Sequence, residues 1–171
     1  MPTTDLNENR TPHMKLMFKT AAVVATVLLP TFAIADAGHD HGGARAYGEP
    51  GDSKKPARTV EIVMKETDDG KMLFEPNSIS ASKGEQIRFV LKNEGQLDHE
   101  FMLATRAEND KHAIAMQKNP DMEHDDPNGR RIAPGKTEEI VWKFSKSGDF
   151  NFACLIPGHR ESGMDGSVAV K

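Results

Sequence analysis

The sequence predicts an all-β sandwich, and three observations support this fold class. Short segments alternate apolar and polar residues, as half-buried strands do. Turn sequences rich in Gly, Asp, Asn and Ser separate these segments. The apolar positions supply two inner faces for one core. Many short strands at such spacing are typical of two packed antiparallel sheets.

The first half of the domain contains four such segments in order. Residues 60–64 alternate cleanly, and a Thr-Asp-Asp-Gly turn follows them. Residues 72–74 and 78–80 are short extended pieces on either side of a proline. After a Ser-Lys-Gly turn, residues 87–91 alternate again, which predicts a further strand.

The second half continues the pattern after one long interruption. Strands are expected over 99–103, 137–144, 150–154 and 166–171. The segment 104–134 is polar and long, and it contains a helix-compatible piece from Glu108 to Lys118. Loops of this length usually carry function or structure of their own, so we expect an insertion with a short helix.

The N-terminal residues 1–35 are predicted to be a signal peptide. Lys15 and Lys19 precede an almost wholly apolar run over 21–32, and Ala33-Ile34-Ala35 is a small-x-small cleavage signal. The apolar run is too short for a transmembrane helix. The alternative is an anchoring helix. Cleavage and export would place the protein in the periplasm, without a membrane segment.

Residues 36–57 are predicted to be a disordered tail, and 58–171 a single domain. The tail is rich in Gly, Asp, Lys, Pro and Ala and has no apolar period. His39 and His41 in this tail are equally compatible with weak Cu(II) binding and with a solvated segment.

The charge of the chain argues against nucleic acid as a partner. Residues 1–35 hold three of the 22 Lys and Arg and two of the 26 Asp and Glu, so the remainder carries a net charge of −5. No basic stripe is visible in the sequence, whereas nucleic-acid-binding proteins usually carry one.

The most informative motif surrounds Cys154, the only cysteine of the chain. His159 follows it by five residues and Met164 by another five, around a Pro-Gly turn. Thiolate and thioether are soft ligands that suit Cu(I), whereas imidazole suits both copper oxidation states. A plane of two histidines and one cysteine with a weak axial methionine is the blue-copper arrangement, and His99 is the candidate for the second imidazole.

Other readings of the same residues exist. A lone cysteine is often a small buried hydrophobe, although an exported protein rarely leaves a thiol without a role. Zinc also takes one cysteine, two histidines and water, but methionine is a poor zinc ligand. The three residue types together therefore favour copper.

These residues resemble the cupredoxins, the plastocyanin/azurin family of copper proteins, over roughly residues 58–171. The resemblance implies a Greek-key β-sandwich with one type 1 copper under the loops at one end. It also implies His99 and His159 as imidazole ligands, Cys154 as the thiolate and Met164 as the axial ligand. Glu100 departs from the family, which usually has Asn or Ser there, and a carboxylate at this place would tune the metal.

The enlarged segment 104–134 is similar to that of the periplasmic copper-tolerance cupredoxins of CopI type. It carries four further candidate donors, which are His112, Met116, Met122 and His124. They would form a weaker second copper site, or Met116 would pack against the sandwich while the histidines are solvated.

The function expected from these features is periplasmic copper binding in copper tolerance, through a redox-active Cu(II)/Cu(I) site. The alternative is a soluble electron carrier that docks briefly on a periplasmic redox partner protein. An enzyme is not expected, because copper oxidases and nitrite reductases need more copper centres and more clustered histidines than one such domain supplies.

Overall fold

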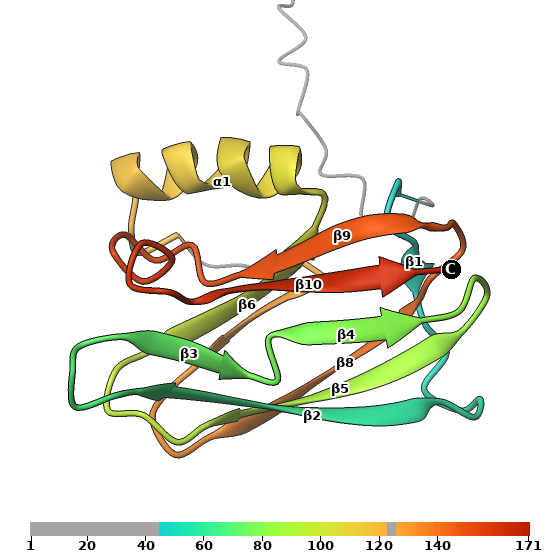
Figure 1. The fold of residues 1–171 in the computed structure, drawn as a ribbon, viewed down its shortest axis with the longest axis horizontal. Helices are drawn as coiled ribbons and strands as arrows, with labels where there is room; N and C mark the ends of the chain where they lie inside the picture. The colour runs from blue at the N-terminus through green and yellow to red at the C-terminus, as the bar shows by residue number, and fades with distance from the viewer. Residues whose placement is uncertain (1–44, 123–125) are drawn as a thin grey trace, which may run out of the picture. The chain divides into compact units, whose positions relative to one another are not determined.

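The computed structural model describes residues 45–122 and 126–171. Among these residues, two five-stranded sheets pack face to face, in the orders β1-β8-β5-β2-β3 and β4-β10-β9-β6-β7, and one helix lies outside them (Figure 1). The elements are β1 (Glu49–Pro50), β2 (Arg58–Glu66), β3 (Met72–Glu75), β4 (Ser78–Ala81), β5 (Gln86–Asn93), β6 (His99–Ala104), α1 (Arg106–Lys118), β7 (Gly129–Ile132), β8 (Thr137–Lys143), β9 (Gly148–Ala153) and β10 (Asp165–Val170). The predicted all-β sandwich with a short helix is confirmed.

The core lies between the two sheets and is rich in phenylalanine. The ring of Phe101 on β6 lies 5.5 Å from that of Phe89 on β5 and 5.1 Å from that of Phe152 on β9. Phe74 on β3 meets Phe152 at 5.2 Å. The Phe89–Phe101 and Phe74–Phe152 contacts join the two sheets. Each buried aromatic side chain stabilises the fold by roughly 1.5–3 kcal/mol.

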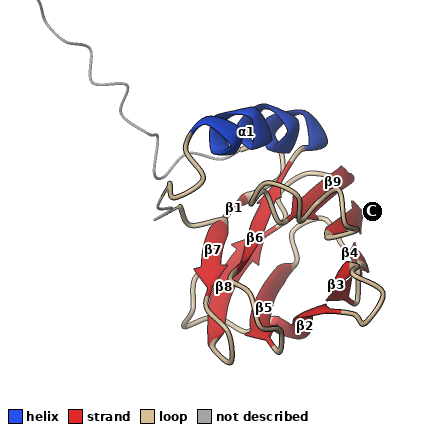
Figure 2. Ribbon diagram, turned by 90° about the vertical axis from the view of Figure 1, so that its left-hand side faces the viewer, coloured by secondary structure: helices blue, strands red, loops and turns tan. Residues whose placement is uncertain are grey.

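Strand β6 is buried at every position because both of its faces are covered. Phe101 and Leu103 point into the core between the sheets, whereas Met102 joins a second apolar cluster outside it. α1 covers that outer face, as the end-on view in Figure 2 shows. The second cluster contains the buried residues Met102, Met116, Ala153 and Leu155.

Helix α1 begins two residues earlier than predicted, because a capping box defines its start. The Thr105 side chain accepts a hydrogen bond from the Glu108 amide, and the Glu108 carboxylate accepts one from the Thr105 amide. An N-cap of this kind contributes about 1 kcal/mol. Buried Asn109 and Met116 then fix which side of the helix faces the sheet.

The structure differs from the predicted disordered tail over residues 45–57. Tyr47 is 2% exposed and stacks on Trp142 with ring centroids 5.4 Å apart, and β1 pairs with the edge of β8. A two-residue strand has no alternation, so the sequence pattern did not reveal it. The predicted signal peptide, His39 and His41 lie outside the described residues. Within the described part of the chain, no helix is long and apolar enough to cross a membrane.

Candidate metal centre

The topology brings the start of β6 beside the end of β9. These strands are antiparallel neighbours, with Met102 opposite Ala153. His99, the first residue of β6, therefore lies close to Cys154, which follows the last residue of β9. Figure 1 shows the loop from β9 to β10 at the left end of the sandwich.

That loop folds back on itself through its main chain. The Cys154 amide donates to the Met164 carbonyl at 3.1 Å, and the Met164 amide donates to the His159 carbonyl at 3.2 Å. Gly163 has a φ of +112°, and a Cβ there would lie 3.2 Å from the Met72 carbonyl oxygen. Only glycine adopts this conformation easily, so Gly163 determines where the chain presents Met164.

Three of the predicted donors converge. The Nδ1 atoms of His99 and His159 are 3.3 Å apart, and Cys154 Sγ lies 3.4 Å from His159 Nδ1. The ligating atoms of all three residues lie within 4.8 Å of one another, and all three residues are buried. Because metal–nitrogen and metal–sulfur bonds are about 2.0–2.3 Å, donors at these separations can share one ion.

Met164, the fourth predicted donor, is fully buried in the same core cluster as Cys154. Its main chain is hydrogen-bonded to Cys154 at one side and to His159 at the other. A thiolate, two imidazoles and a nearby thioether form a soft donor set, which fits copper better than zinc.

Burial controls the protonation of the donors. It raises the pKa of the Cys154 thiol to about 12, although hydrogen bonds from the amides of Glu100 and Ile156 oppose the shift. Burial also lowers the pKa of His99, although the nearby Glu66 carboxylate opposes this shift. Burial lowers the pKa of His159 as well, and the neighbouring His99 lowers it further. Without metal the site therefore holds a neutral thiol and two neutral imidazoles near pH 7, so only the thiol must lose a proton on binding.

Glu100, the residue that departs from the family pattern, contacts the cysteine loop directly. Its amide donates to Cys154 Sγ at 3.2 Å, and its Oε2 accepts from the Leu155 amide at 3.1 Å. Burial raises the pKa of Glu100 to about 7, against the opposing effects of the Leu155 amide and Arg131.

Two polar residues that the sequence pattern does not mark support His99, one by direct contact and one through the loop before it. Glu66, at the end of β2, places Oε1 3.0 Å from His99 Nε2. Asn93 donates from Nδ2 to the carbonyls of Leu97 and Ile132, both at 2.8 Å, and so shapes the loop before His99. The pKa of Glu66 is lowered overall. Burial by itself would raise this pKa, but hydrogen bonds from the amides of Gln96 and Leu97 and the proximity of His99 outweigh burial. Glu66 is far from His99 in the sequence and meets it only through sheet packing, and Asn93 acts through side-chain hydrogen bonds that no periodic pattern marks.

The residues of the predicted second copper site are only partly described. Met116 is buried in the apolar cluster under α1, and Met122 packs against that cluster. His112 lines a separate cavity of about 480 Å³, together with Tyr47 and Asn128. His124 lies outside the described residues, so the second site stays a prediction.

A two-layer β-sandwich with this donor set at one end defines a class of protein, the cupredoxins. The chain belongs to the plastocyanin/azurin family of copper-binding proteins, whose model matches residues 61–171, and within it to the CopI type. The predicted family and its copper cofactor are thus confirmed.

The relatives give the closer placement. The chain is 47% identical to the copper-resistant cuproprotein CopI of Rubrivivax gelatinosus, over 91% of this chain and 98% of that protein. It is 37% identical to the CopI of Pseudomonas aeruginosa, over 81% of this chain and 89% of that protein. Among solved structures, auracyanin A of Chloroflexus aurantiacus matches with a TM-score of 0.56 at 21% identity, over 68% of this chain and 100% of that chain, which shows the shared fold.

Proposed function

We propose that this chain binds one copper ion through His99, Cys154, His159 and Met164 and that it serves periplasmic copper tolerance without catalysing a reaction. The observation that carries the proposal is the convergence of three buried donor residues within 4.8 Å in a copper-binding family fold. Bound copper would supply a one-electron Cu(II)/Cu(I) couple.

Each residue has a distinct task in this proposal. Cys154 provides the thiolate, and the Glu100 amide donates to its sulfur, which favours the anionic form. His99 and His159 provide neutral imidazole nitrogens, and Met164 provides a weak thioether from the side of the core. Since the donors are buried, the protein shields the metal from water and from other thiols.

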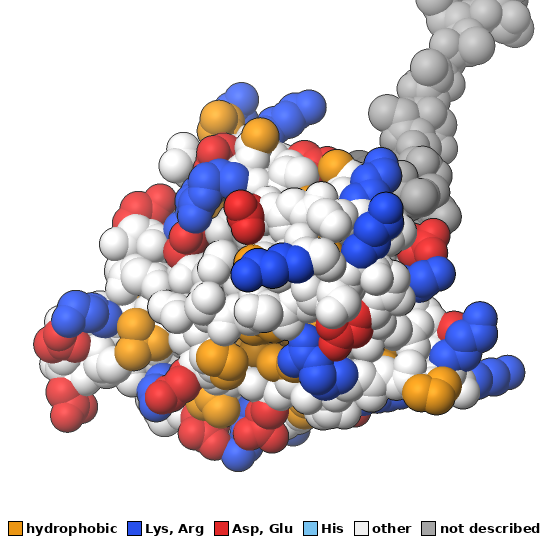
Figure 3. All heavy atoms as spheres, turned by 45° about the vertical axis from the view of Figure 1, so that its right-hand side comes forward, with side chains coloured by type: hydrophobic (Ala, Val, Ile, Leu, Met, Phe, Trp, Pro, Cys, Tyr) orange, Lys and Arg blue, Asp and Glu red, His pale blue; other side chains and the backbone are white. Residues whose placement is uncertain are grey.

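Two lines of support favour copper tolerance. The relatives from Rubrivivax gelatinosus and Pseudomonas aeruginosa are named copper-resistant cuproproteins. The similarity covers 98% and 89% of their lengths. The signal peptide predicted over 1–35 would export the protein to the periplasm. On the face drawn in Figure 3, Lys and Arg side chains are mixed with Asp and Glu, so that face carries no basic stripe of the kind that nucleic-acid-binding proteins use.

Electron transfer is the second candidate function. His159 is 8% exposed. Near it in the same loop, Ile156 is half-buried and Pro157 is exposed. Leu97, in the loop that leads to His99, is 46% exposed. An apolar rim beside a copper ligand would let a redox partner protein dock briefly.

The test is a titration of the protein with Cu(II), followed by visible absorption and EPR. We expect an intense thiolate-to-copper band that saturates at one equivalent. Cys154→Ser and His99→Gln should abolish this band while the circular dichroism of the sandwich persists. His112→Gln is the matched control for His99 and should leave the band intact.

Three outcomes separate the readings. A band that survives in Cys154→Ser would contradict the ligand assignment. Copper taken up beyond the first equivalent, and reduced in His112→Gln, would support copper handling with a second site. A single equivalent with fast electron self-exchange would favour the carrier.

A further inference from the structure

The two nitrogens of the His99 ring face different groups. Nδ1 lies 3.3 Å from His159 Nδ1, in the donor cluster. Nε2 lies 3.0 Å from Oε1 of Glu66, although His99 is fully buried. The ring therefore connects the candidate metal centre to a carboxylate on the opposite sheet, since Glu66 ends β2 and His99 begins β6.

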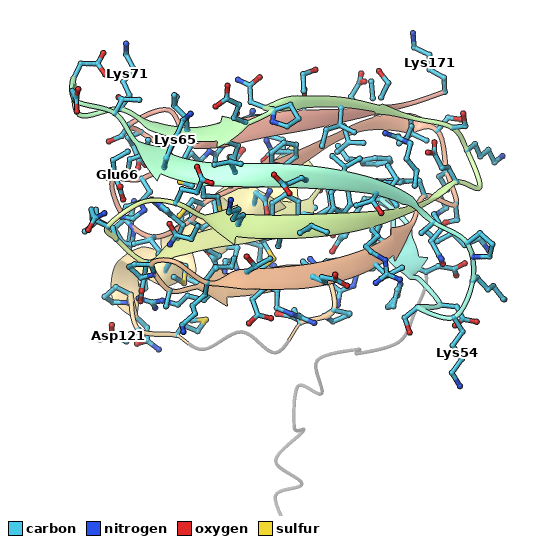
Figure 4. All side chains as sticks on the ribbon, turned by 90° about the horizontal axis from the view of Figure 1, so that it is seen from below. Lys54, Lys65, Glu66, Lys71, Asp121 and Lys171 are labelled. Carbon is cyan, nitrogen blue, oxygen red and sulfur yellow. The ribbon has the colours of Figure 1, made fainter. Side chains whose placement is uncertain are left out.

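The Glu66 carboxylate is itself held in place. Its Oε2 accepts a hydrogen bond from the Gln96 amide at 2.8 Å, and its Oε1 accepts one from the Leu97 amide at 3.1 Å. The loop that contains Gly95 packs tightly against this carboxylate, so that a Cβ added at Gly95 would clash with Glu66 Oε2. Only 22% of the Glu66 side chain is exposed, and it lies at the end of the sandwich that also carries Asp121, away from Lys54 (Figure 4).

We propose that Glu66 is a positioning residue for the copper ligand His99. The negative carboxylate lies beside Nε2 and favours the tautomer with the proton on Nε2, which leaves Nδ1 free to bind the metal. This inference rests on the proposed function, because it assigns a role within the same copper site. Ligating histidines commonly donate their second nitrogen to a carboxylate or carbonyl, and such partners fix the ring and increase its basicity.

The charge of Glu66 gives the proposal a direction. A more basic imidazole donates more strongly to the metal, and a nearby negative charge favours the more highly charged ion. Both effects stabilise Cu(II) relative to Cu(I). Replacing the carboxylate by a neutral amide should therefore weaken Cu(II) binding more than Cu(I) binding and raise the reduction potential.

The test compares Glu66→Gln with Glu94→Gln. Glutamine keeps the shape of the Glu66 side chain but offers only one acceptor oxygen. The carboxylate offers two, to the amides of Gln96 and Leu97 and to the His99 ring. Glu94 is an exposed residue near the same loop that pairs with Lys92, so its variant controls for the lost charge. Glu66→Asp, which keeps the charge, is the conservative rescue.

Two measurements are made on each variant. The first is ¹⁵N NMR of the His99 ring in the protein without metal, which reports the proton on Nε2 or Nδ1 directly. The second is the ratio of Cu(II) to Cu(I) affinities of the loaded protein. We expect Glu66→Gln to lower the Nε2-protonated population and to lower this ratio about tenfold, which is about 59 mV in potential for one electron.

The outcomes decide the proposal separately from the proposed function. The positioning role of Glu66 would be overturned if Glu66→Gln and Glu94→Gln gave the same His99 resonances and the same ratio of Cu(II) to Cu(I) affinities. Values in Glu66→Asp that lie closer to the unsubstituted protein than those of Glu66→Gln would support it. If the unsubstituted protein lacked the thiolate-to-copper band, the proposed ligation would fail, whereas the NMR of the metal-free protein would still decide whether Glu66 holds the His99 ring.

Discussion

The main-chain amide of Glu100 donates a hydrogen bond to Sγ of Cys154 at 3.2 Å. Glu100 directly follows His99, so this bond joins the strand that starts with one candidate ligand to the loop that carries the others. The Glu100 carboxylate also binds this loop, because it accepts a hydrogen bond from the Leu155 amide at 3.1 Å. Hydrogen bonds within the protein, rather than a metal, thus hold His99 and Cys154 near each other, so the site is preorganised.

The buried carboxyl of Glu100 should make stability depend on pH. Its pKa is raised by burial from 4.5 to about 7, so the folded state binds its proton more tightly than the unfolded state. This contribution is fully present below pH 4.5 and is lost as the pH rises through 7. We expect the metal-free protein to lose about 3 kcal/mol over this interval relative to Glu100→Gln, measured by urea unfolding.

A matched control makes this prediction specific. Glu61 lies on the exposed face of β2, so Glu61→Gln should retain the pH dependence of the unsubstituted protein. Parallel unfolding curves for Glu100→Gln and Glu61→Gln at every pH would show that Glu100 does not titrate as its burial implies.

Copper binding should release about one proton per ion near pH 7. The reason is that burial raises the pKa of the Cys154 thiol to about 12, so the thiol is neutral before binding and a thiolate after it. His99 and His159, whose pKa values burial lowers, are already neutral and add no protons. A pH indicator in weakly buffered solution measures the release. Cys154→Ser should release none, and equal release from both proteins would refute the assignment.

Met164→Leu should keep copper but raise the reduction potential. The exchange conserves volume at a fully buried position, so it should cost less than about 1.5 kcal/mol of stability. A thioether donates weakly to Cu(II), and its loss favours Cu(I). Cyclic voltammetry measures the shift. Met102→Leu, in the cluster under α1, is the control and should leave the potential unchanged, whereas complete loss of copper in Met164→Leu would mean that the methionine is more than a weak ligand.

Asn109→Ala should destabilise the domain by about 1–3 kcal/mol. Asn109 is fully buried on α1 and donates from Nδ2 to Asn151 Oδ1 at 2.8 Å and to the Met102 carbonyl at 3.2 Å. Its loss leaves buried acceptors on β9 and β6 without this donor. Chemical unfolding gives the cost, and exposed Gln117→Ala on the same helix should change stability by no more than about 0.5 kcal/mol. Equal effects would mean that α1 is not anchored through Asn109.

A chain that begins at Arg58 should be less stable than one that begins at Arg45, by about 3–5 kcal/mol. The shorter chain lacks Tyr47, which stacks on Trp142, and it lacks β1 at the edge of β8. Thermal unfolding compares the two, and Tyr47→Ala in the longer chain isolates the aromatic contribution. Equal melting temperatures would mean that the domain begins at 58, as its sequence pattern predicts.

The sequence by itself determined the features that depend on local spacing. Alternation over residues such as Ile87, Phe89 and Leu91 predicted strands because successive side chains point to opposite faces. Cys154, His159 and Met164 could be grouped because one short loop carries all three, and His99 because it starts a strand in a family pattern.

Only the tertiary structure decided which distant groups surround these residues. Glu66 meets His99, Glu100 meets Cys154 and Tyr47 meets Trp142 because sheet register and the packing of two sheets bring them together. These contacts leave no periodic trace, since each depends on a single side chain and on strands far apart in the chain. The sequence therefore predicts which residues are the candidate metal donors, whereas the groups that surround and hold these residues depend on the fold.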